Sequence, residues 1–126
     1  MLEFDPKKLT LADLIGIPYK DKGRSLAGLD CYGLAIAAAY IITGKALMDV
    51  IYENHAAALA DEFAPTLNVK KTDEIKPGNL VEMTFNNELH IGVIVDKKTF
   101  IHATINDGVR INNLRNAPIK NIYEVV

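Results

Sequence analysis

The stretch that most constrains the fold is Leu34 to Ile42, a continuous apolar run that follows Asp30 and the chain's only cysteine, Cys31. Asp30 is a good N-cap residue, and Gly44 is of the type that commonly follows a helix end. The sequence therefore predicts a helix from Cys31 to about Thr43. This helix is apolar nearly all round, which is typical of a helix at the centre of a domain rather than on its surface.

Helical patterns come first in the chain and strand patterns follow. We expect a short helix at Leu9–Ile15 and a further helix at Asn54–Phe63, which precedes Pro65. Downstream, short apolar runs separated by turn signals predict six strands, at Leu67–Val69, Leu80–Phe85, Leu89–Val95, Thr99–Ala103, Val109–Ile111 and Ile122–Val126. Helices followed by strands indicate an α+β fold, in which the helices pack on one side of an antiparallel sheet.

Length and composition favour one globular domain over residues 1–126. A chain of 126 residues that is 49% apolar can bury a real core, and its single cysteine excludes an intrachain disulfide. The net charge of −2 argues against a nucleic-acid partner. The acidic N-terminus does not resemble a signal peptide, and no apolar run is long enough to span a bilayer. We therefore expect synthesis in the cytoplasm, with no membrane partner and with separate delivery to any substrate outside the cell.

The position of Cys31 at a predicted helix start suggests a reactive thiol. The unpaired N–H groups and the positive dipole end of a helix N-terminus favour thiolate, which predicts a lowered pKa. The same amides can stabilise an oxyanion. The negative charge of Asp30 opposes this effect, unless its carboxylate is engaged in capping or in binding a substrate amine.

Two histidines, His90 and His102, lie on predicted neighbouring strands and could activate this thiol. A turn centred on Asp96 would place the two side chains directly opposite each other, and a register centred on Lys97 would make them diagonal neighbours on one face. A two-residue loop would put them on opposite faces. In the favoured, directly opposed register, His90 would take the proton of Cys31 and His102 would orient His90.

Other interpretations of the same residues compete with catalysis. A lone cysteine among apolar residues is usually a small buried hydrophobic residue. A zinc site built from Cys31, His55, His90 and His102 is conceivable, but its spacing matches no standard zinc pattern. We therefore expect neither a metal nor another cofactor.

Taken in order, several segments resemble the NlpC-type cysteine peptidases, papain-like enzymes that cut bacterial cell-wall peptides. The matching segments are Ile17-Pro18-Tyr19, Gly28-Leu29-Asp30-Cys31-Tyr32-Gly33-Leu34, Lys76-Pro77-Gly78-Asn79-Leu80-Val81, His90-Ile91-Gly92-Val93-Ile94 and Phe100-Ile101-His102-Ala103. The resemblance implies that Cys31 is the nucleophile, His90 the base and His102 the third polar member. It also implies that Tyr19 lies near the oxyanion or the substrate amine, and Asp30 remains the second candidate for binding substrate.

The substrate implied by the resemblance is the peptidoglycan stem peptide, cut between D-γ-glutamyl and a diamino acid. The sequence lacks the Trp-Gly-Gly that many relatives carry after the tyrosine, and Tyr32 replaces a frequent serine. The chain resembles the phage-tail subgroup in its longer loop from Tyr19 to Cys31 with Lys22-Gly23-Arg24, in the form Asp30-Cys31-Tyr32-Gly33-Leu34 and in the lack of a signal-peptide pattern. This resemblance implies tail proteins as partners and a virion-associated location. A secreted antibacterial amidase effector and a non-catalytic tail-assembly module are the alternatives.

Overall fold

The computed structural model describes residues 1–50, 67–85 and 88–126. Its helical elements are η1 (Pro6–Lys8), α1 (Leu11–Leu14), α2 (Cys31–Thr43) and η5 (Leu114–Asn116), and its strands are β1 (Arg24–Ser25), β2 (Gly28–Leu29), β3 (Val69–Thr72), β4 (Leu80–Phe85), β5 (Glu88–Ile94), β6 (Thr99–Thr104), β7 (Gly108–Asn113) and β8 (Ile119–Val125). The helix predicted over 54–63, together with His55, lies outside the described residues.

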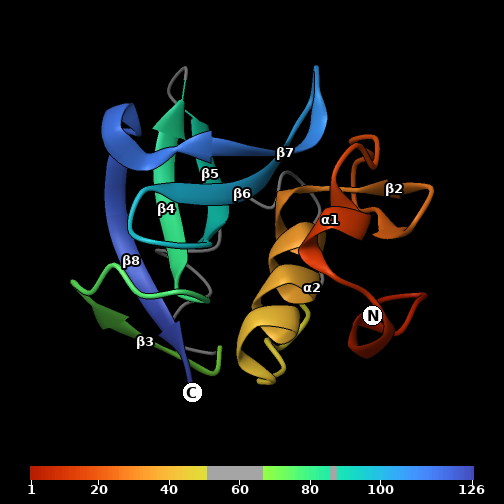
Figure 1. Cartoon of the computed structure of the whole chain (residues 1–126), viewed down its shortest axis with the longest axis horizontal. Coiled ribbons are helices and arrows are strands. Elements are labelled where there is room, and N and C mark those ends of the chain that lie inside the picture. The colour runs from red at the N-terminus through yellow and green to blue at the C-terminus, as the bar shows by residue number, and fades with distance from the viewer. Residues whose placement is uncertain (51–66, 86–87) are drawn as a thin grey trace.

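An antiparallel sheet of six strands forms one side of the molecule, in the order β3-β8-β4-β5-β6-β7. Helix α2 packs against β5 and β6 with one side and against η1 and β2 with another. Figure 1 shows α2 between the sheet and the N-terminal segment. The predicted α+β architecture is confirmed, with few helices and a large sheet.

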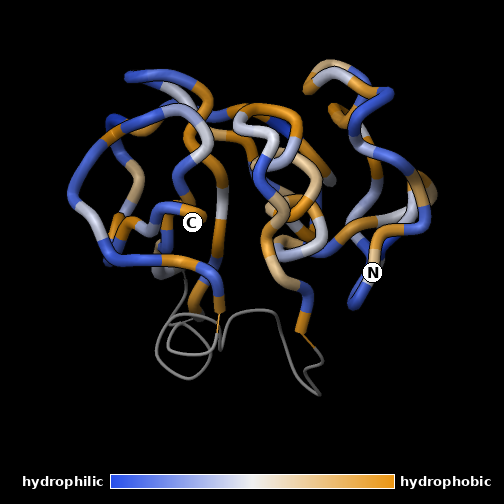
Figure 2. Tube along the Cα trace, turned by 90° about the horizontal axis from the view of Figure 1, so that it is seen from below, coloured by the Kyte–Doolittle hydropathy of each residue, from blue (hydrophilic) through white to orange (hydrophobic). Residues whose placement is uncertain are grey.

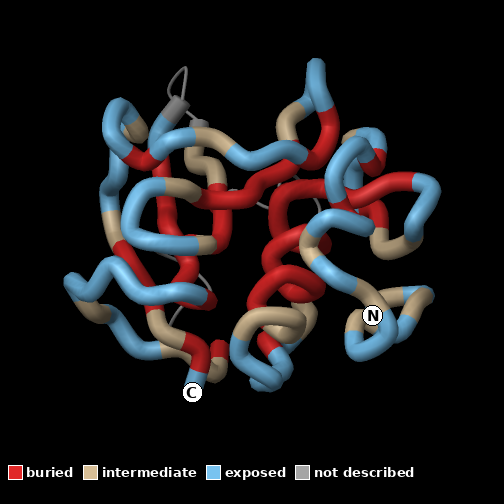
Figure 3. Tube along the Cα trace, viewed as in Figure 1, coloured by how far each residue is buried: buried red, intermediate tan, exposed pale blue. Residues whose placement is uncertain are grey.

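Helix α2 is the central element that its apolar sequence predicts. Residues Cys31 to Ala39 are all buried, and they form one core with apolar side chains of β5 and β6, including Ile91, Val93 and Ile101. Figure 2 shows hydrophobic segments turned inward between helix and sheet, and Figure 3 shows the buried residues concentrated there. The helix ends where Gly44 adopts a left-handed conformation with φ 74°, as its position predicts.

The first helix is shorter than predicted, and β7 and β8 begin earlier. Two further differences have a clear physical reason. The segment from Lys20 to Gly28, whose charges and glycines predict a loop, contains β1 and leads into β2. The two form a small hairpin, whose two-residue strands are too short to give a periodic pattern. Strand β3 begins at Val69, whereas the apolar residues suggested Leu67–Val69. It pairs along β8 through backbone hydrogen bonds, so Lys70 and Lys71 extend the strand with exposed side chains.

The turn between β5 and β6 is closed by one carboxylate. Oδ1 of Asp96 accepts hydrogen bonds from the backbone N–H groups of Lys98 and Thr99, both at 2.8 Å, and from the Thr99 hydroxyl at 3.0 Å. These bonds form a compact Asx-type turn. The turn fixes how β6 returns along β5, and therefore which residues of the two strands face each other.

The N-terminus of α2 is anchored by the fully buried carboxylate of Asp30. Its Oδ1 accepts from the N–H of Gly33 at 2.7 Å and from the guanidinium of Arg24 at 2.9 Å, while Oδ2 accepts from the N–H of Lys22 at 3.2 Å. Arg24 also holds both oxygens of Asp49, with two bonds of 3.1 Å. The pair of Asp30 and Arg24 thus ties the start of α2 to the loop at Lys22 and to the segment at Asp49.

We expect Arg24→Ala to lower the free energy of unfolding by about 3–5 kcal/mol, because it leaves the Asp30 carboxylate buried without its cation. Urea denaturation measures the change. Lys70→Ala is the matched control, since Lys70 pairs with Glu124 on the surface, where such a pair contributes little to stability. If Arg24→Ala costs as much in an Asp30→Asn background as in the native chain, the Asp30 charge is not the reason for the loss.

Candidate active site

Cys31 occupies the place where β5 and β6 stop pairing with each other. Strand β5 pairs with β4 along six residues, but with β6 only at Val93 and Ile94. Beyond that point α2 packs against β5, and Cys31 and Ile91 belong to the same buried cluster. The thiol therefore sits against the strand that carries His90.

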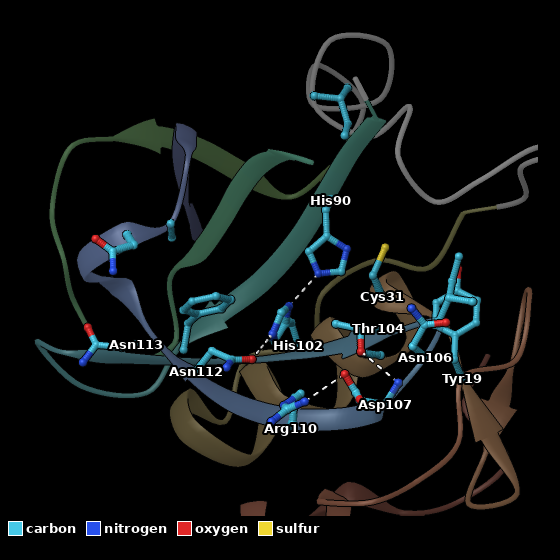
Figure 4. A pocket seen from close by; sticks show the side chains of 16 residues that line it. Tyr19, Cys31, His90, His102, Thr104, Asn106, Asp107, Arg110, Asn112 and Asn113 are labelled. Carbon is cyan, nitrogen blue, oxygen red and sulfur yellow. Dashed lines mark hydrogen bonds and ion pairs between the residues drawn. The ribbon is translucent and has the colours of Figure 1, made fainter. Parts of the chain in front are cut away.

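A chain of hydrogen bonds connects three side chains across the sheet. Nε2 of His90 lies 2.7 Å from Nδ1 of His102, and Nε2 of His102 lies 2.6 Å from Oδ1 of Asn112. In Figure 4 the Cys31 sulfur lies beside the His90 ring, on the side opposite to His102. The structure thus brings Cys31, His90 and His102 together and adds Asn112, which the sequence analysis missed.

The strand register explains why these side chains meet. The β5–β6 ladder pairs Val93 with Ile101 and Ile94 with Phe100, so it is centred on Lys97. The directly opposed register that we favoured from the sequence is therefore wrong, and the diagonal alternative is the one observed. His102 in turn pairs with Arg110 in β7, which makes Asn112 its diagonal neighbour. The three side chains form an oblique line over β5, β6 and β7.

Packing around His102 holds its ring in place. The ring lies against that of Phe100, with centroids 4.5 Å apart, and only 4% of the His102 residue is exposed. Gly92 leaves the necessary room, since a Cβ there would lie 2.9 Å from Phe100 Cδ2 and 3.3 Å from His102 Cβ. The glycine in the segment His90-Ile91-Gly92 is thus a steric requirement of the histidine pair.

Burial keeps both reacting groups neutral. Desolvation and, next, the negative charge of Asp30 raise the pKa of Cys31 to about 12, although hydrogen bonds from the backbone of Ile91, Cys31 and Tyr32 act in the opposite direction. Desolvation, followed by the neighbouring His102, lowers the pKa of His90 to about 4. The prediction of a lowered pKa for this thiol is therefore wrong. Only 5% of Cys31 is exposed, and the cost of burying a thiolate outweighs the favourable effect of the helix dipole.

The two other residues expected near substrate have different surroundings. Tyr19 lines the same cavity as Cys31, and its segment is held beside β2 by hydrogen bonds from Lys20 N–H to Leu29 O and from Leu29 N–H to Pro18 O. Asp30 does not line this cavity. Its carboxylate is buried in the helix cap described above, and so the structure gives it a structural role rather than a position for binding substrate.

The cavity measures about 580 Å³ and joins the histidine pair to a polar wall. One part of this wall is rich in carboxamides, and the charged pair of Asp107 and Arg110 spans 2.8 Å beside it. The cavity is lined by Tyr19, Cys31, Leu89, His90, Phe100, His102, Ala103, Thr104, Ile105, Asn106, Asp107, Arg110, Asn112, Asn113, Asn116 and Ala117. Amide groups both donate and accept hydrogen bonds, so this wall suits an extended peptide.

Within residues 1–50, 67–85 and 88–126, no group of three or more His, Cys, Asp or Glu side chains is arranged to hold a metal ion. The zinc hypothesis included His55, which these ranges omit. In the same part of the chain, no helix has both the length and the apolar character needed to cross a membrane.

A helix that presents a cysteine to histidines of an antiparallel sheet defines a papain-like fold. The chain belongs to the NlpC/P60 family, whose model matches residues 16–126. This match confirms the resemblance noted in the sequence, at the level of the family.

Two solved structures show the same fold. The NlpC/p60 domain of the peptidoglycan hydrolase SagA aligns at 16% identity and a TM-score of 0.63, over 90% of this chain and 92% of that one. NlpC2 from Trichomonas vaginalis aligns at 18% identity and a TM-score of 0.57, over 90% of this chain and 45% of the NlpC2 chain. Comparison with curated proteins gave no match.

We predict that Cys31 is a neutral thiol at pH 7, so its alkylation by iodoacetamide should keep accelerating from pH 6 to pH 9 without reaching a plateau. Asp30→Asn should alkylate faster at every pH, because it removes the charge that raises the thiol pKa and keeps an oxygen that can cap Gly33. Stopped-flow alkylation measures both rates. A plateau below pH 7 would demonstrate a preformed thiolate and contradict this prediction.

Proposed function

We propose that this protein is a cysteine peptidase that hydrolyses peptidoglycan stem peptides through a thioester on Cys31. The observation that carries the proposal is the hydrogen-bonded pair of His90 and His102, which lines one cavity with the thiol at the start of α2. A nucleophile, a base and a residue that orients the base are the minimum set for acyl transfer. Membership in the NlpC/P60 family supports the cell-wall substrate.

In the proposed reaction the sulfur attacks the substrate carbonyl carbon while its proton passes to Nδ1 of His90. Because both groups start neutral, this transfer accompanies bond formation. Backbone N–H groups at the start of α2 and the Tyr19 hydroxyl are the candidate donors to the oxyanion. The intermediate collapses as the amine leaves with the proton from His90. Water then attacks the thioester, gives a proton to His90, and the acid is released as the thiol regains its proton.

The finer parts of the proposal rest on the sequence resemblance. We propose that the bond cut joins D-γ-glutamyl to a diamino acid, and that the protein acts from a phage or prophage tail, where tail proteins are its partners. The form Asp30-Cys31-Tyr32-Gly33-Leu34 and the Lys22-Gly23-Arg24 loop support the tail assignment. Because Asp30 is used in the helix cap and does not line the cavity, we propose that other residues recognise the substrate amine.

We expect the purified protein to release fragments from muropeptides, identified by mass spectrometry, whose masses locate the bond that is cut. Cys31→Ser should lower kcat by about 10³-fold or more, since a serine hydroxyl is a poor nucleophile beside a base of such low pKa. His102→Asn should retain partial activity. Lys70→Ala, on the exposed edge strand β3, is the control that should cleave normally.

Chelators should leave cleavage unchanged, whereas thiol reagents should abolish it. Full activity in Cys31→Ala, or its loss on adding EDTA, would refute the thioester mechanism. A folded protein that cuts no stem peptide of any chemotype would favour the non-catalytic assembly module.

A further inference from the structure

Asn112 lies at the end of the hydrogen-bonded line that runs from His90 through His102. We propose that Asn112 is a positioning residue whose side-chain oxygen decides which nitrogen carries the proton in both histidine rings. Its effect on catalysis rests on the proposed function, but its effect on the rings can be measured independently of any activity.

The contact between Asn112 and His102 has a defined direction. A carboxamide oxygen has lone pairs and no hydrogen, so it can only accept a hydrogen bond. The 2.6 Å separation of Asn112 Oδ1 from His102 Nε2 therefore requires a hydrogen on that nitrogen. A neutral imidazole carries one N–H, so Nδ1 of His102 is then left with a lone pair.

This lone pair determines the state of the next ring. Nδ1 of His102 lies 2.7 Å from Nε2 of His90, so Nε2 of His90 must be the donor of that bond. Nδ1 of His90 then has its lone pair directed to the side from which Cys31 approaches (Figure 4). This nitrogen is the one that must accept the thiol proton if His90 is the base.

The same contacts oppose the other pair of tautomers. It would place a hydrogen on Nδ1 of His90, where it could not accept the thiol proton. It would also direct the Nε2 lone pair of His102 at the oxygen of Asn112, only 2.6 Å away. Because burial lowers the pKa of both histidines and keeps the rings neutral, the tautomer rather than the charge determines whether His90 can act as a base.

The sheet holds Asn112 in this position. Asn112 pairs with Phe100 in the β6–β7 ladder, and Phe100 supports the His102 ring. The adjacent Asn113 has a different partner, since its side chain accepts from the N–H of Arg115 at 2.8 Å and caps η5. Two neighbouring asparagines of one strand thus have separate roles, as alternation along a strand allows.

The test is the tautomer of each histidine in the full chain labelled with ¹⁵N, measured by long-range ¹H–¹⁵N correlation spectra at pH 9, where imidazolium forms are absent. In the native protein both His90 and His102 should show the Nε2–H form. Asn112→Leu keeps the size and removes the acceptor, so the Nε2–H form should lose its dominance in both rings. Asn112→Asp keeps an acceptor oxygen and should keep both tautomers.

Asn116→Leu is the matched control for the spectra, because Asn116 lines the same cavity and is not part of the hydrogen-bonded line of His90, His102 and Asn112. It should leave both tautomers unchanged. In muropeptide cleavage, Asn112→Leu should lower kcat by about 10–10²-fold, as loss of an orienting partner does. A native spectrum with a hydrogen on Nδ1 of His90 overturns the proposal, and so do unchanged tautomers in a folded Asn112→Leu, even if its activity falls. The expected tautomers in a native protein that cleaves nothing would support Asn112 as the positioning residue while refuting the peptidase function.

Discussion

The site depends on one buried carboxylate, that of Asp30. It caps the first turn of α2 through Gly33, holds the preceding loop through Lys22, and is balanced by the guanidinium of Arg24. An uncompensated charge at 0% exposure would be costly, so the loop and the helix start must keep this arrangement. The position of Cys31, the next residue, follows from it.

The same anchoring has an electrostatic cost for the chemistry. A fixed negative charge beside the sulfur opposes the thiolate, and burial opposes it more strongly. The paired histidine is also driven to its neutral form. The site is consequently suited to transferring the thiol proton to His90 as the sulfur attacks, rather than to holding a preformed pair of thiolate and imidazolium. Asn112 fits this arrangement because an amide accepts a hydrogen bond without introducing a charge that would favour imidazolium at His102.

Much of this fold and part of its site could be predicted from the sequence. The central helix, its cap at Asp30 and its end at Gly44 were predictable because they depend on local chemistry. The diagonal placement of the histidines was not predictable. Moving the turn centre from Asp96 to Lys97 keeps the same residues on the same face of the sheet, so the apolar pattern does not distinguish the two registers. Asn112 carried no signal, because asparagine is common in strand ends and its partner is ten positions away in sequence. The raised thiol pKa arises from tertiary burial, which no local pattern measures.

The turn at Asp96 gives this arrangement an unexpected sensitivity to chain length. Its residues are exposed, and exposed turns usually tolerate added or deleted residues. Here the turn sets the pairing of β5 with β6, and sliding one strand by a single residue would move His102 to the opposite face of the sheet. The loop can therefore vary in composition far more freely than in length. A graft that inserted one residue there and slid β6 along β5 would separate the two imidazoles, and it would also turn Ile101 and Ala103 away from the core that they share with α2.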